Sequence, residues 1–324
     1  MSTLLSRRQA LRQAAALATL GLPTLSRANA PALRSLQIVV PAPPGTQPDL
    51  IARWLIDPLS QRAGVPGSVV NRPGASGAIA ADQVLGAPPD SGSLLLGGLD
   101  HVAYSHVNNQ RRALDPLSDF IPVGAVNRDT WLLVTATHSP LGDLAAWREA
   151  ARQGQALTYA STGEGSTAHL LTARLIRALG LNATHVPYKE SYQPDLIAGR
   201  VGFALAPTPS VLGAVRGGKL RALATLAAQR LPGLPDVPSV AELGLKDQVF
   251  YGGLYLFAPA SLGAQVPRLN QWLVDAQLQP DVVERYRAAN IEPTPLSTYA
   301  VRDDIVARLR MVDAMRLAVF GKAR

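Results

Sequence analysis

Two stretches of the chain, SLQIVVPAPPGTQPD at Ser35–Asp49 and LTYASTGEGSTAH at Leu157–His169, follow the same order of residue types. Each begins with a short, largely apolar run, passes through a glycine-containing loop, and reaches a hydroxyl residue before a segment of helical periodicity. This order predicts a strand, a loop and a helix start. Such repeated units predict an α/β fold, with ligand crevices at the carboxyl ends of the strands.

The remaining elements are predicted by working outward from these stretches. Thr46 is the expected N-cap of the first helix, and Pro58 is expected to kink or shorten that helix because its ring clashes with the preceding turn. Strands alternating with helices predict parallel sheets covered on both faces. From about residue 265 onward only helical periodicity is present. The further strands are expected at 68–71, 94–97, 131–135, 184–187, 201–206, 222–226 and, as a longer one, 249–258.

The composition excludes several classes of protein. The chain has 324 residues, of which 47% are hydrophobic and 17% charged, as expected for a globular protein of two domains or one large α/β unit. It has no cysteine, which rules out disulfides, thiolate metal sites, a cysteine nucleophile and a lipidated N-terminal cysteine. Without a nucleophile elbow, a P-loop or a zinc-protease motif, the sequence predicts neither catalytic residues nor a cofactor nor a metal site.

Residues 1–30 are predicted to be an export signal. They combine four arginines, no acidic residue, a short apolar run and a small-x-small ending at Ala28-Asn29-Ala30. Arg7-Arg8 resembles a twin-arginine motif, and the general secretory route is the alternative. Without this segment the net charge falls from +8 to +4, and the basic residues are not interleaved with aromatics, so no nucleic-acid surface is expected. We expect a soluble periplasmic protein beginning near Pro31.

The two loops, residues 41–49 and 161–169, are the candidate binding site. The first N–H groups of a helix lack intrahelical partners and the helix dipole makes this end positive, so each loop favours an anion. Glycine lets a ligand approach the backbone, and threonine and serine hydroxyls add donors. Two such ends facing one cleft suit a dicarboxylate. Ordinary helix capping is the alternative for either loop alone, and a structural hydrogen bond is the alternative for His169.

The chain from Ile38 to about Lys322 resembles the Bug/TctC family, the extracytoplasmic solute-binding proteins of tripartite tricarboxylate transporters. The resemblance rests on separated motifs in the same order. These motifs are Val40-Pro41-Ala42-Pro43-Pro44-Gly45, Val70-Asn71-Arg72-Pro73-Gly74-Ala75, Tyr159-Ala160-Ser161, Val186-Pro187-Tyr188-Lys189, Gly218-Lys219-Leu220-Arg221-Ala222 and Leu234-Pro235-Asp236-Val237-Pro238.

The resemblance implies a two-lobed periplasmic-binding-protein (Venus flytrap) fold, in which each lobe is a sheet flanked by helices. Lobe 1 would comprise 31–126 and 255–324, and lobe 2 would comprise 127–254. It implies a monomeric, non-enzymatic receptor that captures a small organic carboxylate, such as a di- or tricarboxylate, and delivers it to the membrane subunits of a transporter. The implied ligand-binding residues are Ala42, Gly45, Thr46, Asp49, Ser161, Thr162, Gly163, Ser166, His169 and Tyr188.

Some positions depart from the family pattern, and two other functions compete. Glu190 stands where the family usually has glycine, and Gly202 and Ala206 stand where it usually has aspartate. Gly163-x-Gly165-x-x-Ala168 also matches a weak dinucleotide fingerprint, so an exported nucleotide-cofactor oxidoreductase is one alternative. An orphan binding protein that serves a signalling system is the other. Trp131, like the other tryptophans in apolar stretches, is expected in the core.

Overall fold

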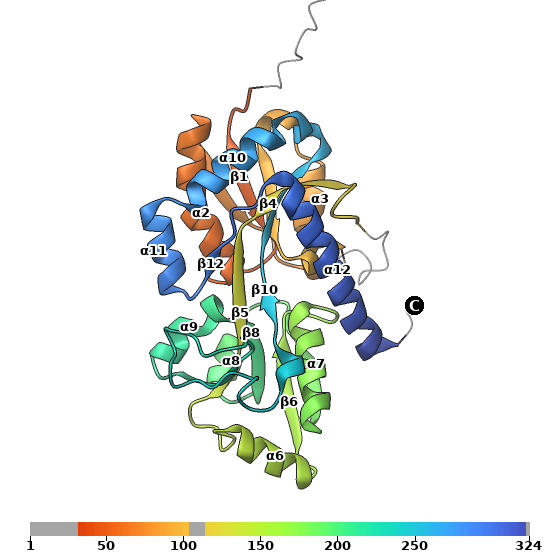
Figure 1. Cartoon of the computed structure of the whole chain (residues 1–324). Helices are drawn as coiled ribbons and strands as arrows, with labels where there is room; N and C mark the ends of the chain where they lie inside the picture. Colours follow the sequence, from red (N-terminus) through yellow and green to blue (C-terminus); the bar gives the residue numbers. More distant parts are fainter. Residues whose placement is uncertain (1–31, 104–113, 322–324) are drawn as a thin grey trace, which may run out of the picture. The chain divides into compact units, whose positions relative to one another are not determined.

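The structure, a computed structural model, describes residues 32–103 and 114–321. The predicted export signal therefore lies outside the described residues. Two β-sheets, each with helices on both faces, form the unit from Leu33 onward (Figure 1). The first sheet has the strand order β2-β1-β3-β11-β4. Its strands are β1 (Leu36–Val40), β2 (Gly67–Asn71), β3 (Ser93–Gly97), β4 (Phe120–Ala125) and β11 (Tyr255–Pro259).

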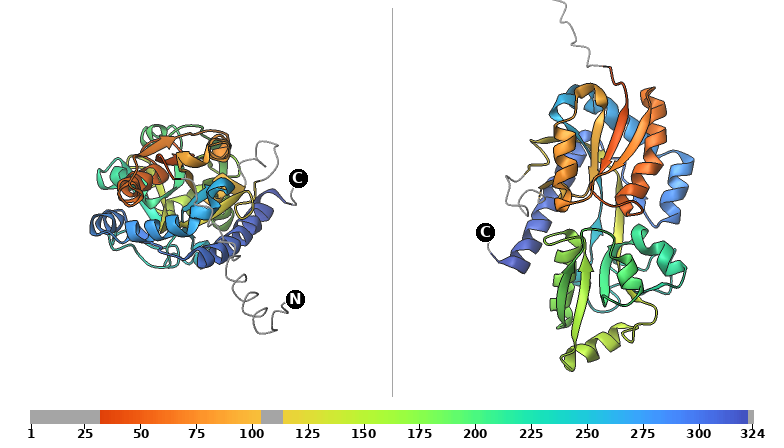
Figure 2. Two further views of the ribbon diagram at one scale, coloured as in Figure 1. Left: turned by 90° about the horizontal axis from the view of Figure 1, so that it is seen from above. Right: turned by 180° about the vertical axis from the view of Figure 1, so that it is seen from behind.

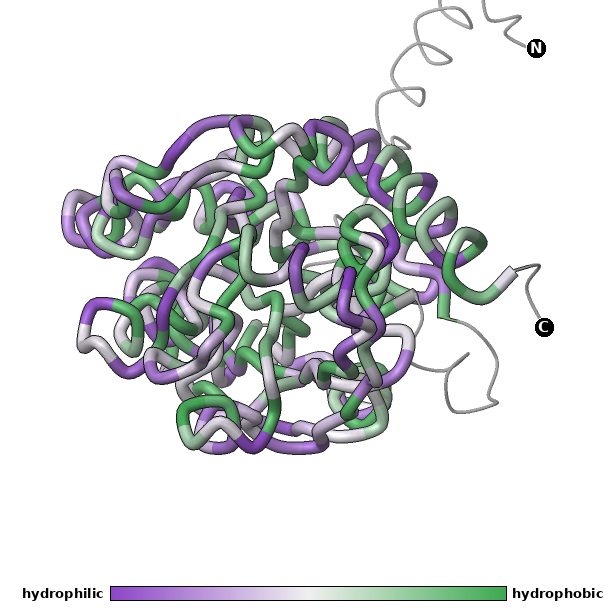
Figure 3. The backbone as a smooth tube through the Cα atoms, turned by 90° about the horizontal axis from the view of Figure 1, so that it is seen from below, coloured by the Kyte–Doolittle hydropathy of each residue, from purple (hydrophilic) through white to green (hydrophobic). Residues whose placement is uncertain are grey.

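Alternate side chains of the first sheet point into two separate core layers. Ile38 and Val40 pack with the helices of one face, and Val39 packs with those of the other. The first face is covered by α2 (Gln47–Ala63), α10 (Val266–Gln277) and α11 (Pro280–Ala288). The opposite face is covered by α3 (Ala78–Leu85), α4 (Leu99–Ala103) and the start of α12 (Thr298–Phe320). Hydrophobic and hydrophilic residues alternate along the outer helices, as this packing requires (Figure 3).

The second sheet is built around β5 (Asn127–Ala136), which pairs with β8, β9, β10 and β12. On one face Leu133 packs with helices α6 and α7, and on the other Leu132 packs with α8 and α9. The other strands of this sheet are β6 (Ala156–Ser161), β7 (Asn182–Pro187), β8 (Phe203–Pro207), β9 (Leu220–Thr225), β10 (Tyr251–Gly252) and β12 (Glu292–Pro293). Its helices are α6 (Leu144–Arg152), α7 (Thr167–Leu179), α8 (Gln193–Ile197) and α9 (Thr208–Arg216).

The chain passes between the sheets along neighbouring segments that hydrogen-bond to each other. The Val126 N–H donates to the Leu254 carbonyl at 2.8 Å, and the Leu254 N–H donates to Asn127 Oδ1 at 3.1 Å. Helix α12 contacts both sheets' cores, since Ile305 packs with the first and Met315 with the second. The rear view of Figure 2 shows this helix running from the helices of the first sheet to α7.

Within the described ranges, no helix combines the length and the hydrophobicity that a membrane crossing requires.

The predicted α/β class is confirmed, but the expectation of parallel sheets is met only in part. Strand β1 runs parallel to β2 and β3, and β6 runs parallel to β7 and β8. Strand β11 runs antiparallel to β3 and β4, and β5 runs antiparallel to all its partners. The physical reason is that both strands arrive from the opposite sheet, and a chain returning from there is not bound by the geometry of a βαβ crossover. Periodicity within a segment cannot reveal such a return.

Two further expectations are corrected. The single long strand expected at 249–258 is two strands in different sheets, because Gly252 and Gly253 carry the chain across. A Cβ at Gly253 would lie 2.6 Å from the Asn127 carbonyl oxygen, so only glycine fits this close approach. Of the two effects expected of Pro58, shortening is wrong, since the first helix continues to Ala63, and the kink stays a prediction.

Candidate functional site

A cavity of about 400 Å³ is lined from both sheets. It lies at the carboxyl ends of strands β1, β3, β6 and β7, since the residues that follow each strand contribute to its wall. Ala42 and Thr46 contribute from the first predicted loop, and Thr162 and Gly163 contribute from the second. Tyr188, from the segment after β7, completes the predicted residues in the wall. The structure thus brings together five of the ten residues predicted to bind ligand.

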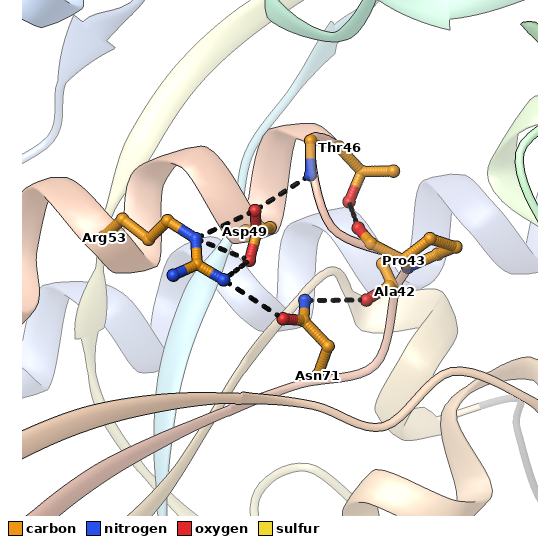
Figure 4. Close-up of polar contacts among 7 residues, drawn as sticks. Ala42, Pro43, Thr46, Asp49, Arg53 and Asn71 are labelled. Carbon is orange, nitrogen blue, oxygen red and sulfur yellow. Dashed lines mark hydrogen bonds and ion pairs between the residues drawn. The ribbon is translucent and has the colours of Figure 1, made fainter.

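The first loop is held in place by a group of polar side chains beneath it (Figure 4). The Gly45 N–H donates to Asp49 Oδ2 at 2.8 Å, and Arg53 Nε donates to the same carboxylate at 3.1 Å. Asn71 accepts from Arg53 and donates its Nδ2 hydrogen to the Ala42 carbonyl at 3.0 Å. The Thr46 hydroxyl does not cap the helix but donates to the Pro43 carbonyl at 2.6 Å.

Asp49 and Gly45 therefore support the first loop and do not line the cavity. Asp49 is only 2% exposed. Burial raises the pKa of its carboxyl group, but hydrogen bonds from Arg53 and Gly45 outweigh burial, so this pKa lies below its ordinary value. The carboxylate is engaged by its own loop. The capping interpretation predicts that Asp49 accepts from a backbone N–H at the helix start. In the usual capping box this N–H belongs to the N-cap residue, here Thr46, whereas Asp49 bonds the N–H of the preceding residue, Gly45.

The second loop is held by neutral groups. Ser166 is the N-cap of α7, because its Oγ accepts from the His169 N–H at 3.3 Å and donates to the Gly163 carbonyl at 2.7 Å. His169 Nδ1 accepts from the Gly165 N–H at 3.0 Å. Ser161 Oγ lies 2.6 Å from His185 Nε2, and the two imidazole rings stack with centroids 3.9 Å apart.

Ser161, Ser166 and His169 lie behind the wall of the cavity and do not line it. Burial and, to a smaller extent, the neighbouring His185 together lower the pKa of His169 to about 4. Burial also lowers the pKa of His185. Both rings are consequently neutral at pH 7, and they orient the loop through hydrogen bonds and stacking.

The first backbone N–H of α2 and that of α7 each donate to a side chain on a helix that covers the opposite sheet. Gln47 N, which opens α2, donates to Ser210 Oγ on α9 at 2.9 Å. Thr167 N, which opens α7, donates to Asp100 Oδ2 on α4 at 3.2 Å. Each helix start thus donates to an oxygen acceptor of the protein itself, as its predicted preference for such acceptors requires. These two hydrogen bonds connect the two sides of the cavity.

The wall residues that sequence reasoning missed include Asp129, Trp131 and Arg308. Trp131 is 9% exposed and meets Phe250 edge-on at 6.1 Å, so the expected core residue is also a wall of the cavity. Arg308, on α12, donates Nε to Asp304 and Nη1 to the Tyr251 carbonyl, which uses two of the five N–H groups of a guanidinium. No sequence motif marks these residues as part of a site. They reach the cavity only because β5 and the C-terminal helix α12 pack close to the two loops in the folded chain.

The fold and the cavity define the class, a solute-binding protein with two sheets around a ligand-sized cavity. Residues 51–308 match the family model described as the tripartite tricarboxylate transporter family receptor, TctC. BugT of Bordetella pertussis is 32% identical over 301 residues, which cover 90% of this chain and 92% of BugT. The chain therefore belongs to the TctC receptor family, as the resemblance predicted.

Solved structures agree with this assignment. MatC of Rhodopseudomonas palustris, solved with bound malate, is 27% identical with a TM-score of 0.76, covering 86% of this chain and 99% of that one. Rpa4515 of the same species, solved with adipate, is 28% identical with a TM-score of 0.80, covering 87% and 96%. The predicted two-lobed periplasmic-binding-protein fold is confirmed.

Proposed function

We propose that this chain is an exported receptor that captures a small organic carboxylate in its cavity and delivers it to the membrane subunits of a tripartite tricarboxylate-type transporter. The observation that carries the proposal is the cavity itself, which two glycine loops line at the carboxyl ends of the strands and to which Arg308 brings a cation. The malate-bound and adipate-bound relatives support a carboxylate as the ligand. The receptor binds and releases this ligand without chemical change.

The division into lobes is part of the proposal. Residues 31–126 and 255–324 would form lobe 1, and 127–254 would form lobe 2. Strand membership supports it, since β5 to β10 lie in the second sheet and β11 returns to the first. Helix α12 packs with the cores of both sheets, and strand β12 pairs with β5 of the second sheet. The C-terminal segment would therefore restrain the opening of the lobes rather than move with one of them. The leader 1–30 would direct the protein to the periplasm, where it would act as a soluble monomer.

The ligand class is tested by thermal unfolding of the purified protein with C4–C6 dicarboxylates, tricarboxylates and aromatic acids. A bound acid raises the melting temperature by mass action on the native state, whereas NAD is expected to leave it unchanged. No shift with any acid at millimolar concentration would contradict the proposal, and a shift with NAD would favour the oxidoreductase instead.

The role of Arg308 in ligand binding is tested with a pair of matched arginine variants. Arg308→Gln is expected to weaken the binding of the best acid about tenfold or more, because a charge-assisted hydrogen bond contributes about 1.5–3 kcal/mol. Arg310, exposed on the same helix, has no such position, so Arg310→Gln should bind like the wild type. Equal losses in both variants would show that only the net charge matters.

A further inference from the structure

The C-terminal helix α12 ends against the side chains that support the second loop. It starts on the first sheet, where Val301 and Ile305 are fully buried, and its later part packs on α7 beside the second sheet (Figure 2). In its last turn the ring of Phe320 meets the imidazole of His169 edge-on, with 5.5 Å between the ring centroids. A residue from the far end of the chain therefore covers the histidine that orients the loop.

The last turn of α12 is anchored on α7 by a polar contact. Arg177 Nη2 donates to the Ala318 carbonyl at 2.8 Å. The last carbonyls of a helix have no intrahelical partner, so a charged donor at this place stabilises the end of α12. Phe320 is 46% exposed, whereas His169 is only 7% exposed. Removing the Phe320 ring would thus uncover the imidazole without emptying a position in the core.

The cover matters because His169 supports the loop as a neutral acceptor. Its Nδ1 accepts from the Gly165 N–H at 3.0 Å, and a protonated imidazole has no acceptor. Thr162 and Gly163 of the same loop line the cavity. Water that reached the imidazole would compete for Nδ1 and would favour the protonated ring. The apolar cover therefore preserves the hydrogen bond that shapes this part of the wall.

The charges around the imidazole leave exclusion of water as the main control of its protonation. The ionisable groups on the surrounding elements include His185 on β7, Tyr159 on β6, Glu164 in the second loop, Arg177 on α7 and Arg316 on α12. His185 opposes protonation of His169, and Tyr159 is neutral because burial raises its pKa to about 12. The two arginines also oppose protonation of the ring, since they are positive. Glu164 favours the protonated form of His185 instead.

We propose that Phe320 is a positioning residue: its ring excludes water from His169 and so fixes the second loop in the shape that lines the cavity. Because α12 is anchored on the first sheet, the loop of the second sheet is supported from both sides. This inference rests on the proposed function for its effect on binding, but its first readout needs no ligand.

The first experiment follows the imidazole signals of His169 by NMR as the pH is lowered, in the wild type and in Phe320→Ala. Loss of the ring should raise the pKa of His169 from about 4 by at least about 1, toward its ordinary value of about 6.5. The Gly165 amide should also exchange its hydrogen about threefold faster or more, because its acceptor is less firmly held. Phe320→Tyr keeps the ring and should restore both wild-type values.

Leu317→Ala is the matched control, since it removes a 52% exposed apolar side chain from the preceding turn of the same helix. It should change neither the pKa of His169 nor the exchange of the Gly165 amide. Equal values in the wild type and Phe320→Ala, or equal changes in Phe320→Ala and Leu317→Ala, would overturn the inference.

The second experiment titrates the best acid into the same proteins by calorimetry. At pH 7, Phe320→Ala should bind about threefold more weakly than the wild type, as expected when one neutral hydrogen bond is weakened. At pH 5 this deficit should grow by about twofold or more, because a ring with a raised pKa is largely protonated there while the wild-type ring is not. Ionisation of the acid affects both proteins alike and cancels in the ratio.

A deficit that does not grow on acidification would overturn the inference, because loss of packing alone is not tied to the protonation of His169. Full rescue by Phe320→Tyr at both pH values would support it. If no acid binds to the wild type, the proposed function fails, whereas the pKa of His169 and the exchange of the Gly165 amide still decide whether Phe320 positions the loop.

Discussion

The first loop, residues 41–49, is supported by charged groups, whereas the second, residues 161–169, is supported by neutral ones. Asp49 and Arg53 hold the first through an ion pair at 2.9 Å, and stacked His169 and His185 hold the second. Yet both loops open a helix whose first N–H donates to a side chain from across the cavity. What the loops share is the geometry at the helix start. The supporting chemistry can differ because any well-placed acceptor or donor can fix a loop.

The largest expected difference between the loops is their response to acid. The pKa of His169 is about 4 in the folded protein and ordinarily about 6.5, so the unfolded chain binds more protons between these values. This group therefore contributes stability above pH 6.5 that is lost as the pH falls toward 4, by up to about 3 kcal/mol. Asp49, whose pKa is lowered below its ordinary value, loses its contribution only at lower pH.

Urea unfolding of the wild type and of His169→Asn at pH 7 and pH 4.5 measures this response. The variant should lose less free energy of unfolding on acidification than the wild type. The comparison must be made as a difference, because Asp129, with its raised pKa, acts with the opposite sign over part of the same range. His138→Asn, at an exposed position, serves as the control and should behave like the wild type. Parallel losses in wild type and His169→Asn would contradict the assignment.

The first loop can be broken at its carboxylate. Asp49→Ala removes the acceptor of the Gly45 N–H and is expected to lower the free energy of unfolding by about 2 kcal/mol at pH 7, since hydrogen bonds to a buried charge are lost. Asp57→Ala, on the exposed side of the same helix, should change it by less than about 0.5 kcal/mol. Denaturant titration measures the free energy of unfolding of both variants. Similar losses in the two would mean that the hydrogen bonds of Asp49 to the first loop do not stabilise the protein.

The smallest expected effect concerns the N-cap of the second loop. Ser166→Ala should lower the free energy of unfolding by about 1 kcal/mol, and Ser297→Ala, at the N-cap of α12, should do so by a similar amount. Only the first substitution should also weaken ligand binding, because Ser166 positions the Gly163 carbonyl behind the cavity wall. Titration of the best acid into both variants separates stability from binding. Equal weakening would remove the second loop from the site.

Much of the local structure was predictable. The strand–loop–helix units at residues 35–49 and 157–169 follow from apolar runs, glycine and hydroxyl placement, and the structure forms them with small shifts at the ends. The split of 249–258 into two strands was not predictable, because Gly252 and Gly253 are required by approaches to residues more than 100 positions away. Trp131 shows the same limit. Apolar neighbours in the sequence indicate that a side chain is buried, but they do not indicate whether it lies in the core or in the wall of the cavity.

The sequence by itself determined the class of the fold and the two loops, since both depend on local periodicity, capping and glycine, which act over a few residues. Only the tertiary structure decided which loop residues face the cavity and which stand behind it. It also decided that Asp129 and Arg308, 179 positions apart in the chain, share one wall. The physical reason is that burial and electrostatic neighbourhood arise from packing between distant segments.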